Sequence, residues 1–142
     1  MKDPIKLWKD IVYRFAEQSE CQSRKTGAIV IKDSRLIGEG WNSPPKQAVV
    51  EHCLRCLDKC KSGTYLEKAI CVHAEANAIA NCAYHGVSLK DAIIVCTHKP
   101  CGECAKLIIG AGIGKVIYFE EYESDYAEYF FVKAGITFNL SE

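Results

Sequence analysis

The sequence predicts an α/β fold in which helices cover a β-sheet, and two observations carry that prediction. In the second half of the chain, apolar strand-like segments alternate with helical ones, a pattern typical of a parallel sheet covered by helices. In the first half, two apolar segments flank a short polar stretch, which predicts a β-hairpin. A chain of 142 residues has the length of one domain, so we expect residues 1–142 to form a single unit.

The N-terminal part of the chain is expected to form a helix followed by this hairpin. Apolar residues recur at helical spacing from Ile5 to Glu20, and Pro4 suits the first turn of a helix. The apolar run at residues 27–31 indicates a buried strand, and residues 36–41 indicate its partner. The Lys-Asp-Ser-Arg stretch between them predicts the turn.

A long excursion separates the hairpin from the alternating part of the chain. Residues 42–65 hold two adjacent prolines, three cysteines among charged residues and a Ser-Gly pair, which predict an irregular segment with room for one short helix. The rest of the chain is expected to hold helices at 73–85, 101–110 and 124–133, and strands at 92–97, 115–119 and 136–140.

The composition narrows the classes of function. The chain has 18 Lys or Arg residues and 18 Asp or Glu residues, and this zero formal net charge argues against binding long nucleic acids. No apolar run approaches the roughly 18 residues of a membrane helix. The first residues, Met-Lys-Asp-Pro, lack the apolar core of a signal peptide. We therefore expect a cytoplasmic protein without a membrane partner, whose nine cysteines are thiols or metal ligands.

Two short motifs offer the ligands of a metal ion. A Cys-Val-His-Ala-Glu segment provides the imidazole of His73, and a Pro-Cys-Gly-Glu-Cys segment provides the thiolates of Cys101 and Cys104. Three protein ligands leave the fourth tetrahedral position of a zinc ion open for water, which is the arrangement of a catalytic site. Bound zinc lowers the pKa of water to about 7. Glu75 is then well placed to move protons without binding the metal.

The spacing of these motifs supports one shared site. Cys101 and Cys104 are three residues apart, so both thiols face the same side of a first helical turn. A helix N-terminus favours a thiolate over a thiol, and Pro100 suits such a start. Because His73 also precedes an alanine-rich helical run, we expect two helix N-termini to meet at one zinc ion. The alternative for the cysteine pair alone is a redox-active or structural C-x-x-C, which His73 and Glu75 disfavour.

With these motifs the chain resembles deoxycytidylate (dCMP) deaminases, within the cytidine-deaminase-like superfamily. His-x-Glu followed by Pro-Cys-x-x-Cys is the signature of zinc-dependent nucleobase deaminases. The segments similar to the dCMP branch are 21–28, 40–42, 53–55, 62–63, 73–79, 100–106 and 111–116. The resemblance implies a three-layer α/β/α fold with a central mixed five-stranded sheet flanked by helices. It also implies a homo-oligomer, hexameric or dimer-based, and hydrolysis of dCMP to dUMP and ammonia in pyrimidine metabolism.

The resemblance implies roles for individual residues as well. His73, Cys101 and Cys104 match the zinc ligands, and Glu75 matches the residue that moves protons. The expected substrate contacts are Ser23, Arg24 and Lys25 at the 5′-phosphate, Asn42 at the sugar, Tyr118 at the base or sugar, and Ala74. Hydroxyl and cationic donors suit a dianionic phosphate. The alternatives are a solvated charged turn at residues 23–25, ordinary turn chemistry for Asn42 and core packing for Tyr118.

Two residues depart from the family pattern where regulatory nucleotides are expected. Trp41 replaces a tyrosine and Ser43 a glycine in the family's Gly-Tyr-Asn-Gly segment, which is associated with binding the effectors dCTP and dTTP. A serine side chain can block a close approach of the backbone. The sequence therefore leaves open whether these nucleotides regulate the protein. The predicted deamination itself does not depend on this segment.

A second cluster of cysteines is a candidate structural zinc site. Some relatives bind a structural zinc at positions that match Cys21 and Cys53, and the four ligands would come from Cys21, Cys53, Cys56, Cys60 and Cys71. On one straight helix Cys53 and Cys60 would lie about 10 Å apart, too far to share an ion comfortably. Either one adjacent pair contributes or the helix breaks between them. A second zinc would stabilise the long excursion; the alternative is free thiols.

Two other functions compete with the metabolic enzyme. A nucleic-acid deaminase, acting on tRNA or a single strand, would need a basic groove that the balanced charge does not indicate. A zinc-stapled binding protein without catalysis would not need Glu75, because a structural site has no use for a carboxylate beside a three-ligand ion. A near-helical aromatic stripe near the C-terminus favours core or subunit interface over a base-stacking platform: Tyr122, Tyr126, Tyr129 and Phe130.

Overall fold

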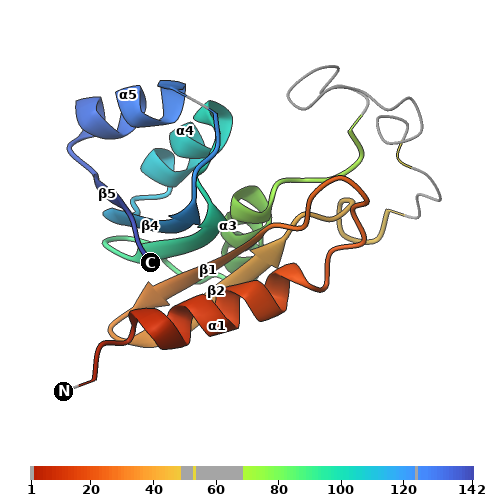
Figure 1. Cartoon of the computed structure of the whole chain (residues 1–142), viewed down its shortest axis with the longest axis horizontal. Coiled ribbons are helices and arrows are strands. Elements are labelled where there is room, and N and C mark those ends of the chain that lie inside the picture. Colours follow the sequence, from red (N-terminus) through yellow and green to blue (C-terminus); the bar gives the residue numbers. More distant parts are fainter. Residues whose placement is uncertain (1, 49–52, 54–68, 124) are drawn as a thin grey trace.

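Five strands and four helices are found in the described residues, 2–48, 53, 69–123 and 125–142, of the computed structural model (Figure 1). The strands are β1 (Gly27–Lys32), β2 (Arg35–Trp41), β3 (Ile93–His98), β4 (Lys115–Glu120) and β5 (Thr137–Leu140). The helices are α1 (Ile5–Ala16), α3 (Ala74–Tyr84), α4 (Gly102–Gly110) and α5 (Asp125–Ala134). Apart from the end of α1, each end lies within one residue of its predicted position.

The strands form one mixed sheet in the order β2-β1-β3-β4-β5. Strand β1 pairs antiparallel with β2 on one side and with β3 on the other. Strands β3, β4 and β5 run parallel, because α4 and α5 carry the chain back between them. The mixed five-stranded sheet that the family resemblance implies is therefore confirmed.

Helices cover both faces of this sheet, which gives three layers (Figure 1). Successive residues of a strand point to opposite faces, and β1 shows the consequence. Ala28 and Val30 belong to the core beneath α3, α4 and α5. Ile29 and Ile31 pack with Val12 of α1 on the other face. The expected α/β/α arrangement is confirmed; among the described residues, one helix lies on one side of the sheet and three lie on the other.

The hairpin brings the start of β1 and the end of β2 to one edge of the sheet. At its closed end Asp33 and Ser34 have φ values of 51° and 62°, as in a two-residue type I′ turn, whose twist matches that of the strands. At its open end the N–H of Asn42 donates to the carbonyl of Thr26 at 3.3 Å. The segments before β1 and after β2 therefore lie side by side.

Glycine at position 40 lets α3 approach this open end closely. A Cβ atom on Gly40 would lie 2.5 Å from the carbonyl oxygen of Ala74 and 2.5 Å from the amide nitrogen of Ala78. Only a residue without a Cβ leaves room for that approach. The N-terminal end of α3 is thereby fixed against the end of β2.

Helix α1 ends at Ala16, so the predicted end at Glu20 is wrong. The N–H of Ser19 donates to the carbonyl of Ala16, three residues back, which tightens and ends the helix. The buried hydroxyl of Ser19 then donates to the carbonyl of Asn42 at 2.8 Å. This polar contact directs the chain toward the end of β2. The spacing of apolar residues, on which the predicted helix end was based, does not reveal such a contact.

The long excursion is described only in residues 42–48 and at Cys53, and the description of the chain resumes at residue 69. Ser43 and Val72 form an isolated antiparallel bridge, so the excursion leaves and returns at one place. The short helix expected within residues 42–65 falls largely outside the described residues. No helix in the described part of the chain is both long and apolar enough to cross a membrane.

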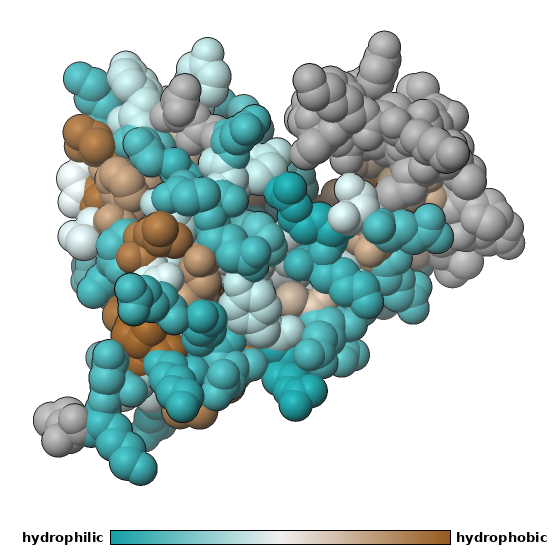
Figure 2. Space-filling view, in the orientation of Figure 1, coloured by the Kyte–Doolittle hydropathy of each residue, from teal (hydrophilic) through white to brown (hydrophobic). Residues whose placement is uncertain are grey.

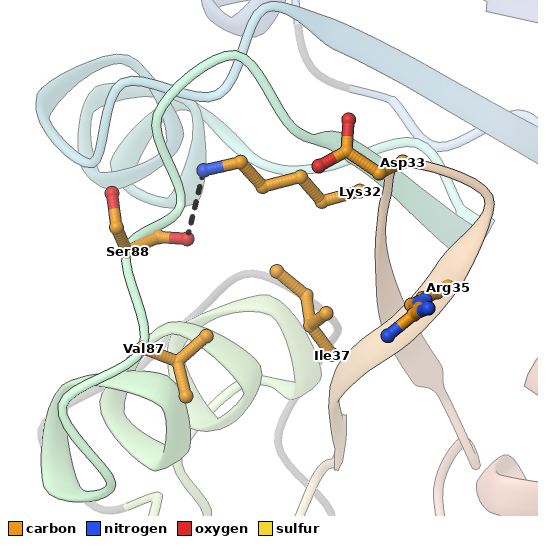
Figure 3. A pocket seen from close by; sticks show the side chains of 6 residues that line it. All are labelled: Lys32, Asp33, Arg35, Ile37, Val87 and Ser88. Atoms are coloured by element: carbon orange, nitrogen blue, oxygen red, sulfur yellow. Dashed lines mark hydrogen bonds between the residues drawn. The ribbon is translucent and has the colours of Figure 1, made fainter.

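A hollow of about 510 Å³ opens between the hairpin turn and the segment after α3 (Figure 3). It is lined by Lys32, Asp33, Arg35, Ile37, Val87 and Ser88. This hollow lies at the closed end of the hairpin. The predicted metal ligands and substrate residues gather at the open end.

Candidate zinc centre and active site

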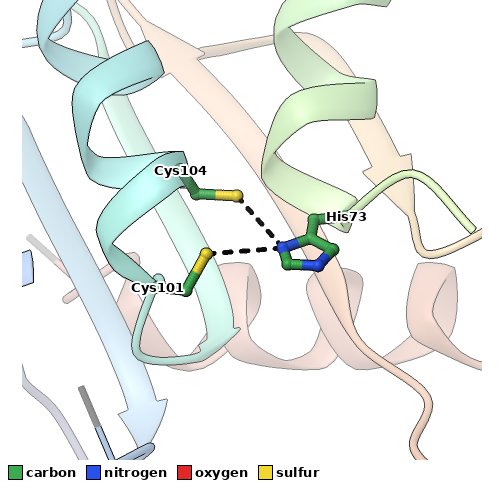
Figure 4. Close-up of side chains that lie close together, drawn as sticks. All are labelled: His73, Cys101 and Cys104. Atoms are coloured by element: carbon green, nitrogen blue, oxygen red, sulfur yellow. Dashed lines mark hydrogen bonds between the residues drawn. The ribbon is translucent and has the colours of Figure 1, made fainter. Parts of the chain in front are cut away.

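The three predicted metal ligands come together at the N-terminal ends of two helices. His73 is the N-cap residue of α3 and Cys101 that of α4, with Cys104 in the first turn of α4. The Nδ1 atom of His73 lies 3.4 Å from the Sγ atom of each cysteine (Figure 4). The structure thus places side by side the residues that the two sequence motifs single out.

The spacing and chemistry of these atoms suit a zinc ion. All three ligand atoms lie within 4.8 Å of one another. Around a tetrahedral zinc with bonds of about 2.0–2.3 Å, ligand atoms lie roughly 3.5–3.8 Å apart. Two thiolates and one imidazole are donors that zinc prefers, and they leave one position open. Within the described residues, no other three His, Cys, Asp or Glu side chains gather in this way.

The two cysteines differ in acidity because they share a proton. The hydrogen bond from Cys104, together with that from His73, lowers the pKa of Cys101 to about 4 in spite of burial. Bonding to Cys101 and burial raise the pKa of Cys104. The N-terminus of α4 adds a favourable field for negative charge. A bound dication would displace the remaining proton and hold both sulfurs as thiolates.

Glu75 is a buried carboxyl beside this centre. It lies in the first turn of α3 and is 6% exposed. Burial raises its pKa, and a backbone hydrogen bond and His73 oppose the shift. The carboxyl interacts with Cys104 but is not one of the three grouped ligands. A carboxyl with a raised pKa, next to a metal site, can both take up and release a proton.

The predicted sugar residue binds the backbone of the predicted phosphate segment. The Nδ2 atom of Asn42 donates to the carbonyl of Arg24 at 2.7 Å, and the N–H of Thr26 donates to Oδ1 of Asn42 at 2.9 Å. Ser23, Arg24 and Lys25 are all exposed. The turn chemistry considered for Asn42 is therefore present, and it orders the segment in which the phosphate donors lie.

A second segment faces these residues from the end of β4. The guanidinium of Arg24 lies 5.1 Å from the centre of the Tyr122 ring, a cation–π contact.

His98, at the end of β3, has its Nδ1 atom 2.9 Å from the hydroxyl of Thr97 and its Nε2 atom 3.5 Å from a carboxylate oxygen of Glu120. Burial lowers the pKa of His98, and the charge of Arg24 adds to that effect.

Two other predicted substrate residues are buried. Ala74 is fully buried at the start of α3, where it follows His73 directly. Tyr118 is 4% exposed and belongs to the core between the sheet and α3, α4 and α5. The structure favours the core-packing alternative for Tyr118.

The two residues that depart from the family pattern have structural partners. The ring of Trp41 stacks on that of Phe15, with centroids 6.1 Å apart. Ser43 exchanges backbone hydrogen bonds with Val72 and accepts another, at Oγ, from Asn77. Ser43 therefore joins the end of the hairpin to the segment that enters α3.

Sequence reasoning did not find two residues that support the centre. Asn77 donates hydrogen bonds to the carbonyl of Trp41 and to Oγ of Ser43. The sequence feature that could have pointed to Asn77 is its position four residues after His73, on the same face of α3. Lys99, 7% exposed, lies just before Pro100 and pairs with Glu128 of α5 and, at 3.5 Å, with Glu121. No sequence spacing pointed to Lys99.

The second cluster of cysteines is only partly described. Cys21, Cys53 and Cys71 are half-buried. Cys56 and Cys60 lie outside the described residues, and a second zinc site stays a prediction.

Fold and site together define a class of protein. An α/β/α domain that presents His, Cys and Cys from two helix N-termini, with a glutamate two residues after the histidine, is the framework of a zinc-dependent nucleobase deaminase. The family follows from the sequence match: residues 3–120 match the cytidine and deoxycytidylate deaminase zinc-binding region, and the chain belongs to this family.

Individual relatives agree with this assignment. The chain is 39% identical over 126 residues to ComE operon protein 2 of Bacillus subtilis, covering 86% of this chain. It is 36% identical over 112 residues to the deoxycytidylate deaminase of Mycobacterium phage D29, covering 75% of this chain and 86% of that protein. The dCMP deaminase of cyanophage S-TIM5 in complex with dCMP and dUMP has a TM-score of 0.85 at 30% identity, with 99% of both chains covered.

Some relatives are considerably longer. The chain spans 62% of the Bacillus subtilis protein's length, and 35% and 39% of the deoxycytidylate deaminases of Schizosaccharomyces pombe and Saccharomyces cerevisiae.

Proposed function

We propose that this chain hydrolyses dCMP to dUMP and ammonia with a catalytic zinc ion bound by His73, Cys101 and Cys104. The observation that carries the chemistry is Glu75, a buried carboxyl beside a three-ligand metal centre. The choice of dCMP is supported by similarity to the cyanophage enzyme over nearly the full length of both chains. Cytosine deamination needs an activated water, which a bound zinc ion would supply, and a group that moves its protons, which is the role proposed for Glu75.

In this proposal, activation of the water and transfer of its protons are separate roles in one hydrolysis. Zinc, when bound, supplies the Lewis acidity that makes water a nucleophile near neutral pH. Glu75 would move both protons of the attacking water in turn: the first to the ring nitrogen, and the second, from the hydroxyl formed at C4, to the departing amino group. The water oxygen bonds to C4 of the base, the bond from C4 to the amino nitrogen breaks, and ammonia leaves.

The exposed segment at residues 23–25 is proposed to receive the 5′-phosphate. Arg24 and Lys25 bring cationic donors, and charge-assisted hydrogen bonds are the strong ones for a phosphate. The hydrogen bonds to Asn42 hold the backbone on both sides of Lys25. Asn42 is proposed to reach the sugar with its second amide hydrogen, since one hydrogen is used by Arg24.

Two further proposals concern metal content and assembly. A structural zinc bound by four of Cys21, Cys53, Cys56, Cys60 and Cys71 would order the excursion. A homo-oligomer is supported by apolar side chains that α5 and the edge strand β5 expose: Tyr126, Tyr129, Val132 and Leu140. Figure 2 shows apolar residues gathered toward that side of a mainly hydrophilic face. A cytoplasmic location would fit free dCMP as the substrate.

The test is turnover of a substrate panel, followed by ultraviolet absorbance. The panel holds dCMP, CMP, deoxycytidine, dCTP and a cytosine-containing oligonucleotide, each with and without added dCTP or dTTP as effector. We expect dCMP to be the best substrate and its product to be dUMP. Preferred turnover of the oligonucleotide would assign the chain to nucleic-acid deamination instead.

A further inference from the structure

One side-chain amide joins the zinc helix to the segments on either side of the long excursion. Asn77 lies on α3 one turn after His73, and its backbone N–H donates to the His73 carbonyl at 2.9 Å. Its Nδ2 atom lies 2.8 Å from the carbonyl oxygen of Trp41, 3.1 Å from Oγ of Ser43 and 3.4 Å from the carbonyl oxygen of Val72. Asn77 therefore contacts both the segment that leaves β2 and the segment that enters α3.

These partners fix the orientation of the amide. Trp41 and Val72 present carbonyl oxygens, which only accept hydrogen bonds, so the atom that faces them must be the amide nitrogen. The acceptors are held together by the backbone pair between Ser43 and Val72, at 2.7 Å and 3.3 Å. The change Asn77→Asp would keep the side-chain shape but set a carboxylate oxygen against two carbonyl oxygens.

The segment that Asn77 holds contains Asn42, which in turn holds the proposed phosphate segment. Asn42 stands between Trp41 and Ser43 in the chain, and its amide binds the backbone of Arg24 and Thr26 at 2.7 Å and 2.9 Å. Two asparagine amides thus connect the helix that begins at the metal ligand to the backbone of Arg24.

We propose that Asn77 is a positioning residue for nucleotide recognition, which sets where the phosphate segment lies relative to the zinc centre. The proposal rests on the proposed function, because it requires residues 23–25 to receive the phosphate. The reacting base and the phosphate are two ends of one substrate, so their binding groups must keep a fixed separation. A displacement of about 1 Å can lower a rate by about 10²-fold.

A purely structural role predicts something different. Loss of stability alone lowers the fraction of folded enzyme, which reduces turnover of dCMP and deoxycytidine by the same factor. Loss of positioning lowers the turnover of dCMP more than that of deoxycytidine, because both substrates would lose the sugar contact of Asn42 but only dCMP loses the phosphate contacts as well. The ratio of the two kcat/KM values therefore separates the two roles, whatever the amount of active enzyme.

The experiment compares zinc-loaded wild-type enzyme with Asn77→Asp and with Asn77→Ala, which removes the amide without adding charge. We expect both changes to lower the dCMP-to-deoxycytidine ratio of kcat/KM by at least ~10-fold, with zinc content unchanged. In an Arg24→Ala background, Asn77→Ala should lower the ratio by a smaller factor than in wild type, because one of the contacts that it positions is already gone. If the Asn77 variants do not fold, Ser43→Ala removes one acceptor and should lower the ratio by a smaller factor.

Asn81 provides a matched control on the next turn of α3. Its Nδ2 atom lies 3.3 Å from a carboxylate oxygen and 3.5 Å from the carbonyl oxygen of Glu39, away from the substrate segments. Asn81→Ala should leave the ratio unchanged. An unchanged ratio in the Asn77 variants, or an equal loss for both substrates, would overturn the positioning role while leaving the phosphate site in place. A wild-type enzyme without phosphate preference would overturn both.

Discussion

The Nδ1 atom of His73 lies 3.4 Å from the Sγ atom of Cys101, although 28 positions separate the two residues. They meet because each caps a helix and both helices lie on the same face of the sheet. The backbone N–H of Cys104 bonds to the thiol of Cys101, and the partial positive charge of the two helix N-termini favours negative charge on these ligands. The centre is therefore positioned by two helix starts that the sheet holds in place.

Exchange of the buried carboxyl should separate proton transfer from metal binding. We expect Glu75→Gln to keep its zinc and to lose about 10²–10⁴-fold in kcat, the usual contribution of a general acid–base group. Cys101→Ala should instead lose the metal, because one of three ligands is gone. Elemental analysis and dCMP turnover of the same preparations check both outcomes. Loss of zinc from Glu75→Gln, or near-full turnover, would contradict the role of Glu75.

The close approach of α3 to β2 gives a prediction about stability. A Cβ atom at position 40 would meet backbone atoms of Ala74 and Ala78 at 2.5 Å, and backbone cannot move aside as a flexible side chain can. We expect Gly40→Ala to lower the free energy of unfolding by about 1–3 kcal/mol, as overpacking does. It should also weaken zinc binding, because the start of α3 must shift.

Gly110 is the control for this change. It ends α4, and a Cβ atom there would meet nothing within 4 Å. Gly110→Ala should therefore be neutral or stabilise by about 0.5–1 kcal/mol. Denaturant unfolding of both variants checks the pair. Equal stability of Gly40→Ala and wild type would mean that α3 lies further from β2 than the structure shows.

Local signals made most of the fold, and the meeting of His73, Cys101 and Cys104, predictable from the sequence. The cysteine spacing and the helix starts at His73 and Cys101 are short-range features, and they predicted the centre directly. The contacts of Asn77 with Trp41 and of Lys99 with Glu128 were not predictable, because these partners are far away in the sequence. Tyr118 illustrates the same limit: its place at a strand end was known, but not which helices cover it.

The lowered pKa of His98 affects the stability of the folded protein at mildly acid pH. Burial lowers the pKa of this imidazole in the folded protein, so the unfolded chain, with a value near 6.5, takes up the proton first. The stability that His98 contributes is therefore present above about pH 6.5 and is lost as the pH falls toward the folded value. Glu120 opposes the shift, and Arg24 adds to it.

The variant that tests this is His98→Gln, which cannot be protonated. With saturating zinc, its unfolding free energy should fall less steeply than that of wild type between pH 7 and pH 5. Denaturant titrations at several pH values provide the comparison, and loss of zinc at low pH is common to both proteins. A steeper fall in the variant would contradict the direction of the shift.

Metal content tests the proposed structural zinc. Elemental analysis of protein purified without chelators should give two zinc ions per chain. Cys53→Ser should lower this to one and reduce the thermal midpoint, because structural zinc contributes folding energy directly. It should leave the catalytic ion in place. A single zinc in the unmutated protein would leave these cysteines without the proposed role.

The last prediction concerns the phosphate of the substrate. A site built for a phosphate leaves cationic donors without partners when the nucleoside binds, so discrimination between the two is large. With two or more charge-assisted hydrogen bonds, dCMP should be turned over at least ~10²-fold more efficiently than deoxycytidine. CMP should trail dCMP, because the 2′-hydroxyl must be accommodated beside Asn42.

Arg24→Ala should lower that preference while leaving the weak turnover of deoxycytidine nearly unchanged, since the nucleoside never used the guanidinium. Arg14→Ala is a matched control, because Arg14 is an exposed arginine on α1 whose contact is with Glu17 at 3.3 Å. Its loss should not change the preference. The readout is kcat/KM for dCMP and deoxycytidine with each enzyme. If deoxycytidine matched dCMP, or if Arg24→Ala lowered both equally, the phosphate site at residues 23–25 would be wrong. The chain would then fall in the broader class of cytosine deaminases, and this segment would be a solvated turn held by Asn42.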